Sequence, residues 1–211
     1  LLEDSPISLE PLLGKLFAEE SSLMLDDSFV HGTGAGQPLG ILNSACLVSS
    51  AKETGQAATT IVAENIINMW SRMWGPSKKR SVWFINADTI PQLMTMQISV
   101  GTGGIPVYMP ANGLAGAPYG TMFGRPVIEF EFCSTLGTQG DVILADWSYY
   151  LIGQKRRGIQ KATSIHLRFD YDETAFRYVM RIDGQPWLDS AITPAVSTTT
   201  LSPFVVLDTR S

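Results

Sequence analysis

The sequence predicts an α+β fold, in which helices and mostly antiparallel strands occupy separate stretches of the chain. Two stretches in the first part, residues 8–31 and 60–75, carry apolar residues at helical spacing. From residue 126 onward, short apolar or alternating runs follow one another across turns, which is typical of strands. Because no helical segment separates these strands, we expect them to pair mainly antiparallel.

The first element should be a helix of more than twenty residues, beginning near Leu9 and ending at His31. Ser8 is a good N-cap, and Gly32 is placed to end the helix in the left-handed conformation. Apolar residues recur at helical spacing, which predicts one buried face. We expect four of them to pack against a sheet: Leu9, Leu13, Leu16 and Met24.

A glycine-rich loop with the sequence GTGAGQPLGIL follows this helix at residues 32–42. Phosphate-binding glycine loops precede a helix, so that amide groups at the helix N-terminus point at the phosphate. Here the glycines follow the helix and lack a Lys-Ser/Thr ending. We therefore reject a nucleotide-binding interpretation of this loop.

The middle of the chain should supply the core. A helix capped by Thr60 and closed by Gly75 is expected, followed by a central buried strand at 81–85 and a short helix at 89–96. Residues 99–120 are rich in glycine and proline, and we expect no regular element there.

The second half should consist of strands at 126–130, 142–146, 149–152 and 203–207. Residues 164–171 and 176–182 alternate polar and apolar side chains, which predicts a long, half-exposed antiparallel pair. Asp183–Pro186 should form a tight polar turn at the tip of that pair.

Composition excludes several classes of protein. A formal net charge of −5 argues against a dedicated nucleic-acid binder, which needs a basic face. The two cysteines, Cys46 and Cys133, give no disulfide framework and no metal-binding pair, so we expect them to be buried as small apolar residues. No apolar run approaches the roughly 18 residues that a membrane span needs.

The sequence offers little enzyme chemistry. The two histidines, His31 and His166, lie on different elements, and neither G-x-S-x-G nor H-E-x-x-H occurs. Glu20, Asp26 and Asp27 could pair carboxylates for acid–base chemistry or metal binding, but a solvated or intersubunit face is the better interpretation. We therefore assign no catalytic, cofactor-binding or metal-ligating residue.

Several motifs, taken in order, resemble those of HK97-like phage major capsid proteins. They are the long helix with its GTGAGQPLGIL exit, the strand and turn WFINADT at 83–89, the turn GTMFGRPV at 120–127, and GDVILADWSYY at 140–150. RIDG at 181–184 and PFVVL at 203–207 complete the order. Each motif is weak alone, but together they cover nearly the whole chain.

This resemblance implies a capsid fold with a spine helix and a peripheral antiparallel sheet, joined to an axial domain with a central sheet and flanking helices. The peripheral domain would comprise residues 1–50 and 159–190, and the axial domain residues 51–158 and 191–211. The family's N-terminal arm and extended loop would lie before Leu1. We therefore expect this segment alone to form monomers or small oligomers and not closed shells.

The implied function is structural: a head subunit of a tailed phage or prophage that self-assembles into an icosahedral shell around double-stranded DNA. Hexamers and pentamers of the same chain would form the shell in the bacterial cytoplasm, with scaffold, portal and decoration proteins as possible partners and no membrane. Packaged DNA would be contacted without sequence specificity. No cofactor is implied, and the residues of the family's isopeptide cross-link find no counterpart here.

Function would then lie in interfaces. Candidate assembly contacts are Lys155, Arg156, Arg157, Arg177, Arg181, Asp183, Gly184 and Gln185. A loop toward the capsomer axis would contain Gly101, Gly103, Gly104, Asn112 and Gly113. Two alternatives stay open: an encapsulin-like nanocompartment shell with the same fold, and, more distantly, a carboxylate- or metal-dependent enzyme.

Overall fold

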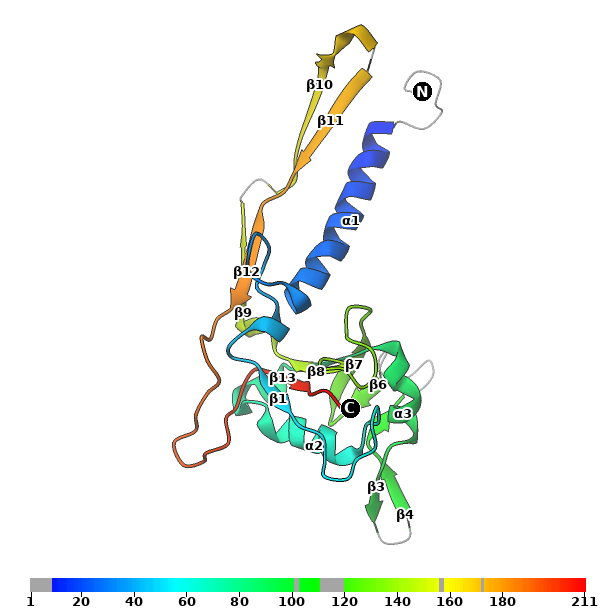
Figure 1. Cartoon of the computed structure of the whole chain (residues 1–211), viewed down its shortest axis with the longest axis vertical. Coiled ribbons are helices and arrows are strands. Elements are labelled where there is room, and N and C mark those ends of the chain that lie inside the picture. Colours follow the sequence, from blue (N-terminus) through cyan, green and yellow to red (C-terminus); the bar gives the residue numbers. More distant parts are fainter. Residues whose placement is uncertain (1–8, 101–102, 111–119, 156–157, 172) are drawn as a thin grey trace. The chain divides into compact units, whose positions relative to one another are not determined.

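The computed structural model describes residues 9–100, 103–110, 120–155, 158–171 and 173–211 (Figure 1). Its helices are α1 (Leu9–His31), α2 (Ala63–Arg72) and α3 (Ile90–Thr95). The chain divides into two compact units, one of Leu1–Gly40 and Ile152–Gln185, the other of Ile41–Leu151 and Pro186–Ser211. We call them unit 1 and unit 2. The expected assignment of residue ranges to peripheral and axial domains stays a prediction.

Most strands belong to unit 2. In chain order, the strands of the molecule are β1 (Val48–Ser50), β2 (Val82–Ile85), β3 (Gln97–Val100), β4 (Gly103–Pro106), β5 (Tyr108–Met109), β6 (Gly120–Met122), β7 (Arg125–Glu129), β8 (Val142–Ala145), β9 (Tyr150–Gln154), β10 (Gln160–Arg168), β11 (Glu173–Val179), β12 (Ile182–Pro186) and β13 (Phe204–Leu207). The α+β class is confirmed.

A seven-stranded mixed sheet forms the centre of unit 2, in the order β1-β13-β8-β2-β7-β6-β5. The predicted central strand is confirmed, because β2 lies between β8, its antiparallel neighbour, and β7, its parallel one. Side chains alternate across a strand, so Trp83 and Ile85 face one side and are buried. They share a core with Ile66 and Met69 of α2.

The opposite side of β2 carries Phe84, which is half-buried under a smaller aromatic layer. Its ring meets those of Phe130 and Trp147 edge-on, at centroid distances of 5.8 and 6.0 Å. The predicted burial of this strand is therefore only partly confirmed, because the second layer leaves Phe84 in contact with solvent.

The helix α2 begins later than predicted, and Thr60 is not its cap. The Asn65 side chain accepts a hydrogen bond from the Val62 amide at the helix start, at 3.1 Å. The Thr60 carbonyl instead accepts from the Arg210 guanidinium at 2.6 Å. The helix ends at Arg72, and Gly75–Lys79 form a 3-10 helix. The short helix predicted at 89–96 is present as α3, preceded by a turn that Asn86 caps.

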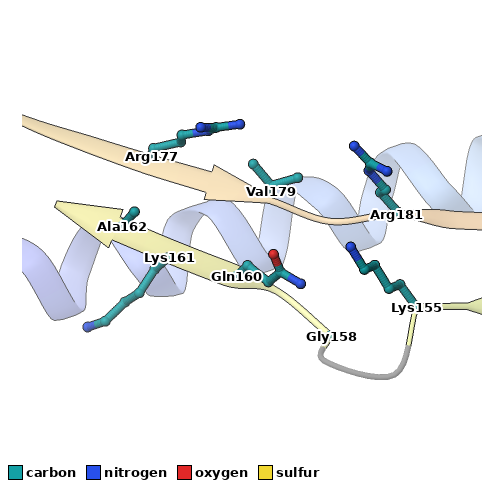
Figure 2. Close-up of a pocket in the computed structure, with 8 residues that line it drawn as sticks. All are labelled: Lys155, Gly158, Gln160, Lys161, Ala162, Arg177, Val179 and Arg181. Carbon is teal, nitrogen blue, oxygen red and sulfur yellow. The ribbon is translucent and has the colours of Figure 1, made fainter.

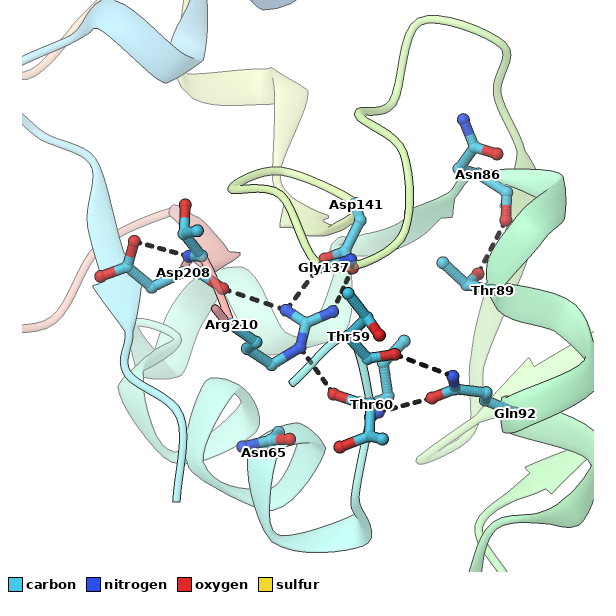
Figure 3. A network of polar contacts seen from close by, with 12 residues as sticks. Thr59, Thr60, Asn65, Asn86, Thr89, Gln92, Gly137, Asp141, Asp208 and Arg210 are labelled. Atoms are coloured by element: carbon cyan, nitrogen blue, oxygen red, sulfur yellow. Dashed lines mark hydrogen bonds and ion pairs between the residues drawn. The ribbon is translucent and has the colours of Figure 1, made fainter. Parts of the chain in front are cut away.

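A buried polar network closes unit 2 (Figure 3). Arg210 and Asp141 are both fully buried and form an ion pair. The guanidinium also donates to the carbonyls of Thr60 and Asp208, and the Gly137 amide donates to the Asp141 carboxylate at 2.9 Å. Because each polar group has partners, the buried charges are compensated.

The expectation that 99–120 lacks regular structure is wrong for the residues described there. β3 and β4 pair as an antiparallel hairpin, and β5 and β6 extend the main sheet. Backbone hydrogen bonds form this hairpin, so its glycines do not prevent pairing. Gly104 lies beneath the Gln97 side chain, where a methyl group would overlap with it. Residues 101–102 and 111–119 lie outside the described residues.

In unit 1, α1 packs on the antiparallel ladder of β10 and β11, which confirms the predicted strand pair (Figure 1). The Phe17 and Tyr178 rings stack at 5.1 Å, Gly14 lies against the Tyr178 ring, and the Glu10 carboxylate binds the Lys161 ammonium at 2.6 Å. At 23 residues, α1 is the longest described helix, as predicted.

The predicted burial of Leu16 and Met24 is wrong, since these side chains are 50% and 65% exposed. A two-stranded ladder is narrow and touches α1 along one stripe, that of Glu10, Gly14 and Phe17. In the described part of α1, only Val30 is buried.

The glycine loop after α1 folds back as a tight hairpin, closed by a bridge between Thr33 and Leu39. Gly32 is not left-handed, contrary to the prediction. It is required because a methyl group there would overlap with the carbonyl oxygens of Pro38 and Ser28. Gly34 and Gly36 do adopt positive φ, at 76° and 75°.

Asp183–Pro186 is not a turn at the tip of the strand pair, because these residues belong to β12 and pair with β9. The Gly184 carbonyl also accepts a hydrogen bond from the Leu39 amide at 2.7 Å, which ties the glycine loop to β12. Among the described residues, no helix has the length and apolar character needed to cross a membrane.

Candidate assembly surfaces

Three of the predicted contact residues come together in a groove on the β10–β11 ladder (Figure 2). The groove has a volume of about 220 Å³, and we call it the cationic groove. Its lining consists of Lys155, Gly158, Gln160, Lys161, Ala162, Arg177, Val179 and Arg181.

The strand register explains which side chains meet there. Gln160 lies opposite Val179 and Ala162 lies opposite Arg177, whereas the intervening pair, Lys161 and Tyr178, points to the other face and contacts α1. The Lys155 amide donates to the Arg181 carbonyl at 3.1 Å, so these two cationic side chains are neighbours. The groove therefore opens on the face of the ladder that α1 does not cover.

The groove concentrates positive charge on an acidic protein. Arg177, Arg181 and Lys155 are exposed, and in the described part of the chain none of them forms an ion pair. Lys161 also lines the groove, but its ammonium points to the other face of the ladder, where the contact with Glu10 raises the pKa of the Lys161 ammonium. Such a site can bind a carboxylate or phosphate group through charge-assisted hydrogen bonds.

The other predicted contacts are not part of this groove. Asp183 and Gln185 are exposed on β12, and the Asp183 carboxylate accepts from the Gly184 amide at 2.8 Å. Gly184 itself is buried, and its role as an assembly contact stays a prediction. Arg156 and Arg157 lie outside the described residues, as do Gly101, Asn112 and Gly113 of the loop toward the axis. Gly103 and Gly104 belong to β4.

Sequence reasoning missed Gln160 and Lys161 as groove residues. Their pairing with β11 depends on the strand register, and the predicted strand began only at residue 164. Alternation traced back from Val179 and Tyr178 would have placed Gln160 and Lys161 opposite them, had the turn between the strands been located correctly.

The carboxylates on α1 do not gather into a catalytic or metal site. The Asp27 carboxylate contacts His31 Nδ1 at 2.8 Å, and burial raises the pKa of Asp26. Within the described ranges, no group of three or more histidine, cysteine, aspartate or glutamate side chains could hold a metal ion. His166 is on the exposed part of β10, away from these residues in the chain.

The basic turn Lys78–Arg80, which precedes β2, makes its contacts within unit 2. The Lys78 ammonium lies 5.3 Å from the centre of the Trp70 ring, and Arg80 pairs with the buried Asp146 at 3.2 Å. Both predicted buried cysteines are confirmed. Burial, together with the nearby charge of Asp141, raises the pKa of Cys133 to about 12, so this thiol stays neutral and unreactive.

The chain matches one family model and shares its fold with solved capsid structures. The family model described as the phage capsid family matches residues 1–197. The solved capsid of an empty GTA particle has a TM-score of 0.72 and 16% identity, and that of a native GTA particle has 0.73 and 15%. Each comparison covers 100% of this chain and 69% of the other. No curated protein matches the chain.

Proposed function

Because this chain belongs to the phage capsid family, we propose that it is the major head subunit of a tailed phage or prophage, and that its copies form an icosahedral shell around double-stranded DNA. The family match over residues 1–197 carries the proposal, because it includes residues of both units. The fold shared with two solved capsids supports it.

We propose that the activity of this protein lies in contacts between copies and not in an enzymatic site. Unit 1 would serve as the peripheral domain and unit 2 as the axial domain. Hexamers and pentamers would form in the bacterial cytoplasm, with scaffold, portal or decoration proteins joining them. The acidic net charge of −5 fits a container whose DNA contacts are few and independent of sequence.

The test uses particles from cells that encode the protein. Particles are purified on a density gradient, treated with nuclease and then opened. We expect peptides of this chain to dominate mass spectra of the particle fraction, and DNA to be protected until the particles are opened. Absence of the chain from every particle fraction would overturn the proposal.

The same experiment separates the encapsulin-like alternative. That type of shell would also contain this chain as its main protein, but it would enclose an enzyme and no protected genome. Particles with a cargo protein and without nuclease-resistant DNA would therefore replace the phage interpretation with the nanocompartment one.

A further inference from the structure

The helix α1 carries one stripe of residues that faces the ladder and a second stripe, of exposed leucines, on its opposite side. Glu10, Gly14 and Phe17 contact the ladder. Leu12 and Leu16 each lie two residues from a member of that stripe, which is about 200° around a helix. They therefore point away from the ladder, and their side chains are 40% and 50% exposed.

The exposed stripe continues along the helix. Leu23 lies 11 residues after Leu12, close to three full turns, and is 50% exposed. Glu19 and Glu20 fill the turn between Leu16 and Leu23 and are exposed. We call Leu12, Leu16, Glu19, Glu20 and Leu23 the open helix face. It is apolar with acidic side chains at its centre.

Unit 1 thus presents two complementary surfaces on opposite sides. The cationic groove opens on the face of the ladder that α1 does not cover, and its walls include the apolar side chains of Val179 and Ala162. The open helix face points away from the same ladder. One surface carries cations without ion pairs among the described residues, and the other carries exposed glutamates between leucines.

We propose that the open helix face of one copy docks into the cationic groove of a second copy. Glu19 and Glu20 would meet Arg177, Arg181 and Lys155, and the leucines would cover the apolar walls. Two different surfaces on opposite sides of a subunit give a head-to-tail contact, which can repeat from copy to copy and close into rings. This inference rests on the proposed shell function and names one of its contacts.

The charges favour this occupant. The helix from Leu9 to His31 contains five acidic residues, Glu10, Glu19, Glu20, Asp26 and Asp27, against one lysine. Lys15 lies 3.6 Å from Glu19 in an exposed pair, which is weak and can exchange for an arginine of the neighbour. Glu20 forms no ion pair in the described part of the chain.

The test is a charge swap read by sedimentation of the purified chain over a range of concentrations. The first variant reverses the groove (Arg177→Glu with Arg181→Glu), and the second reverses the helix (Glu19→Lys with Glu20→Lys). We expect the wild-type chain to self-associate reversibly. Each variant alone should associate at least about tenfold more weakly, because like charges then face each other.

Recovery by mixing is the decisive result. In an equimolar mixture, the acidic helix of the first variant can dock into the basic groove of the second, and the basic helix of the second into the acidic groove of the first. Association should therefore return to within about threefold of wild type, as it should in the fourfold variant. Salt should weaken all of these associations, since the charges are exposed.

Lys79→Glu is the matched control, because this exposed lysine lies in unit 2, outside both surfaces. It should associate like wild type, and circular dichroism should show every variant folded. A wild-type chain that never self-associates would overturn the proposal, as would variants that associate normally.

Loss in both variants without recovery on mixing would also overturn it. The groove would then bind another acidic partner or DNA. These outcomes are independent of the particle experiment, in which failure of the shell function appears as absence of the chain from particles.

Discussion

The fully buried ion pair of Arg210 and Asp141 is the most demanding contact at the scale of single residues. Replacing Arg210 by alanine would leave the Asp141 carboxylate buried without a counter-charge. We expect the free energy of unfolding to fall by about 3–5 kcal/mol. Urea denaturation measures this, with Lys15→Ala as the control, because its exposed pair with Glu19 contributes at most about 1 kcal/mol.

A change smaller than about 1 kcal/mol for Arg210→Ala would show that Asp141 finds other partners or solvent. Replacing both residues by apolar ones of similar size is a second comparison. It should be much less harmful than either single change, because no uncompensated charge remains.

Asp146 should make the stability of unit 2 depend on pH. Burial alone would raise the pKa of Asp146, but hydrogen bonds from Ser148 and Arg80 oppose this, and the net pKa lies below its usual value. A lowered pKa in the folded state stabilises the protein above the ordinary carboxyl pKa of about 3.9. That contribution is lost as the pH falls through the folded pKa.

The measurement is the urea midpoint of the wild-type chain and of Asp146→Asn between neutral pH and pH 3. The wild type should lose more stability than the variant over the acidic end of this range. Parallel pH profiles for the two proteins would contradict the assignment.

These residue-scale features differ in how far the sequence reveals them. Burial of Cys46 and Cys133 follows from composition, because two isolated cysteines behave as small apolar side chains. The ion pair of Arg210 with Asp141 cannot be predicted from composition, because 69 residues separate the two and only the folded sheet brings them together. The role of Thr60 could not be predicted either. Its hydroxyl suggested a helix cap, but the structure uses its backbone carbonyl, which accepts a hydrogen bond from Arg210.

At the scale of elements, the loop at 32–40 needs glycine for two different reasons, which are close approach of the backbone at some positions and positive φ at others. A methyl group at Gly40 would overlap with backbone atoms of Val30 and Gly32, which cannot move aside. Gly36 has a positive φ but nothing within 4 Å of the added carbon. We expect Gly40→Ala to cost about 3 kcal/mol, and Gly36→Ala about 1 kcal/mol.

Denaturant unfolding of the two variants side by side checks this ranking. Equal losses would mean that backbone strain, and not close approach, determines the loop sequence. Sequence inspection recognised the glycines as special but assigned left-handed geometry to Gly32. A close approach between segments cannot be distinguished from a turn without the fold.

Other elements show the same limit. The pair of β10 and β11 followed from alternation, and the central place of β2 followed from its apolar run. The hairpin of β3 and β4 was missed because its pairing depends on the backbone, while glycine and proline content suggested a loop. Pairing of β12 with β9 was missed because an Asp-Gly pair usually indicates a turn.

At the scale of the whole molecule, the two units should differ in their protection from hydrogen exchange. The side chains of β8 and β13 are fully buried in the sheet of unit 2, whereas in the described part of the chain β10 and β11 pair only with each other, and their side chains are exposed or half-buried. Amide exchange followed by mass spectrometry should be slowest in β2, β8 and β13 of the unassembled chain. Equal protection of β10 and β11 would contradict this.

Family and fold class were recognisable because several weak motifs occur in a fixed order along the chain. The cationic groove was recognisable only in part, since Arg177, Arg181 and Lys155 could be named as contacts but not placed on one face. Which side α1 covers is decided by the register of β10 against β11.

The sheet order of unit 2 also has a consequence for synthesis on the ribosome. β1 pairs in parallel with β13, and β13 separates β1 from β8 (Figure 1). The ribosome makes β13 about 150 residues after β1, which at cellular rates takes on the order of ten seconds. β8 ends at Ala145 and β13 begins at Phe204, so for the last part of that time the edge of β8 that β13 will cover has no native neighbour. Crowded ribosomes on one message would hold many such edges close together, so infrequent initiation of translation or a bound chaperone should protect the yield of assembly-competent subunits.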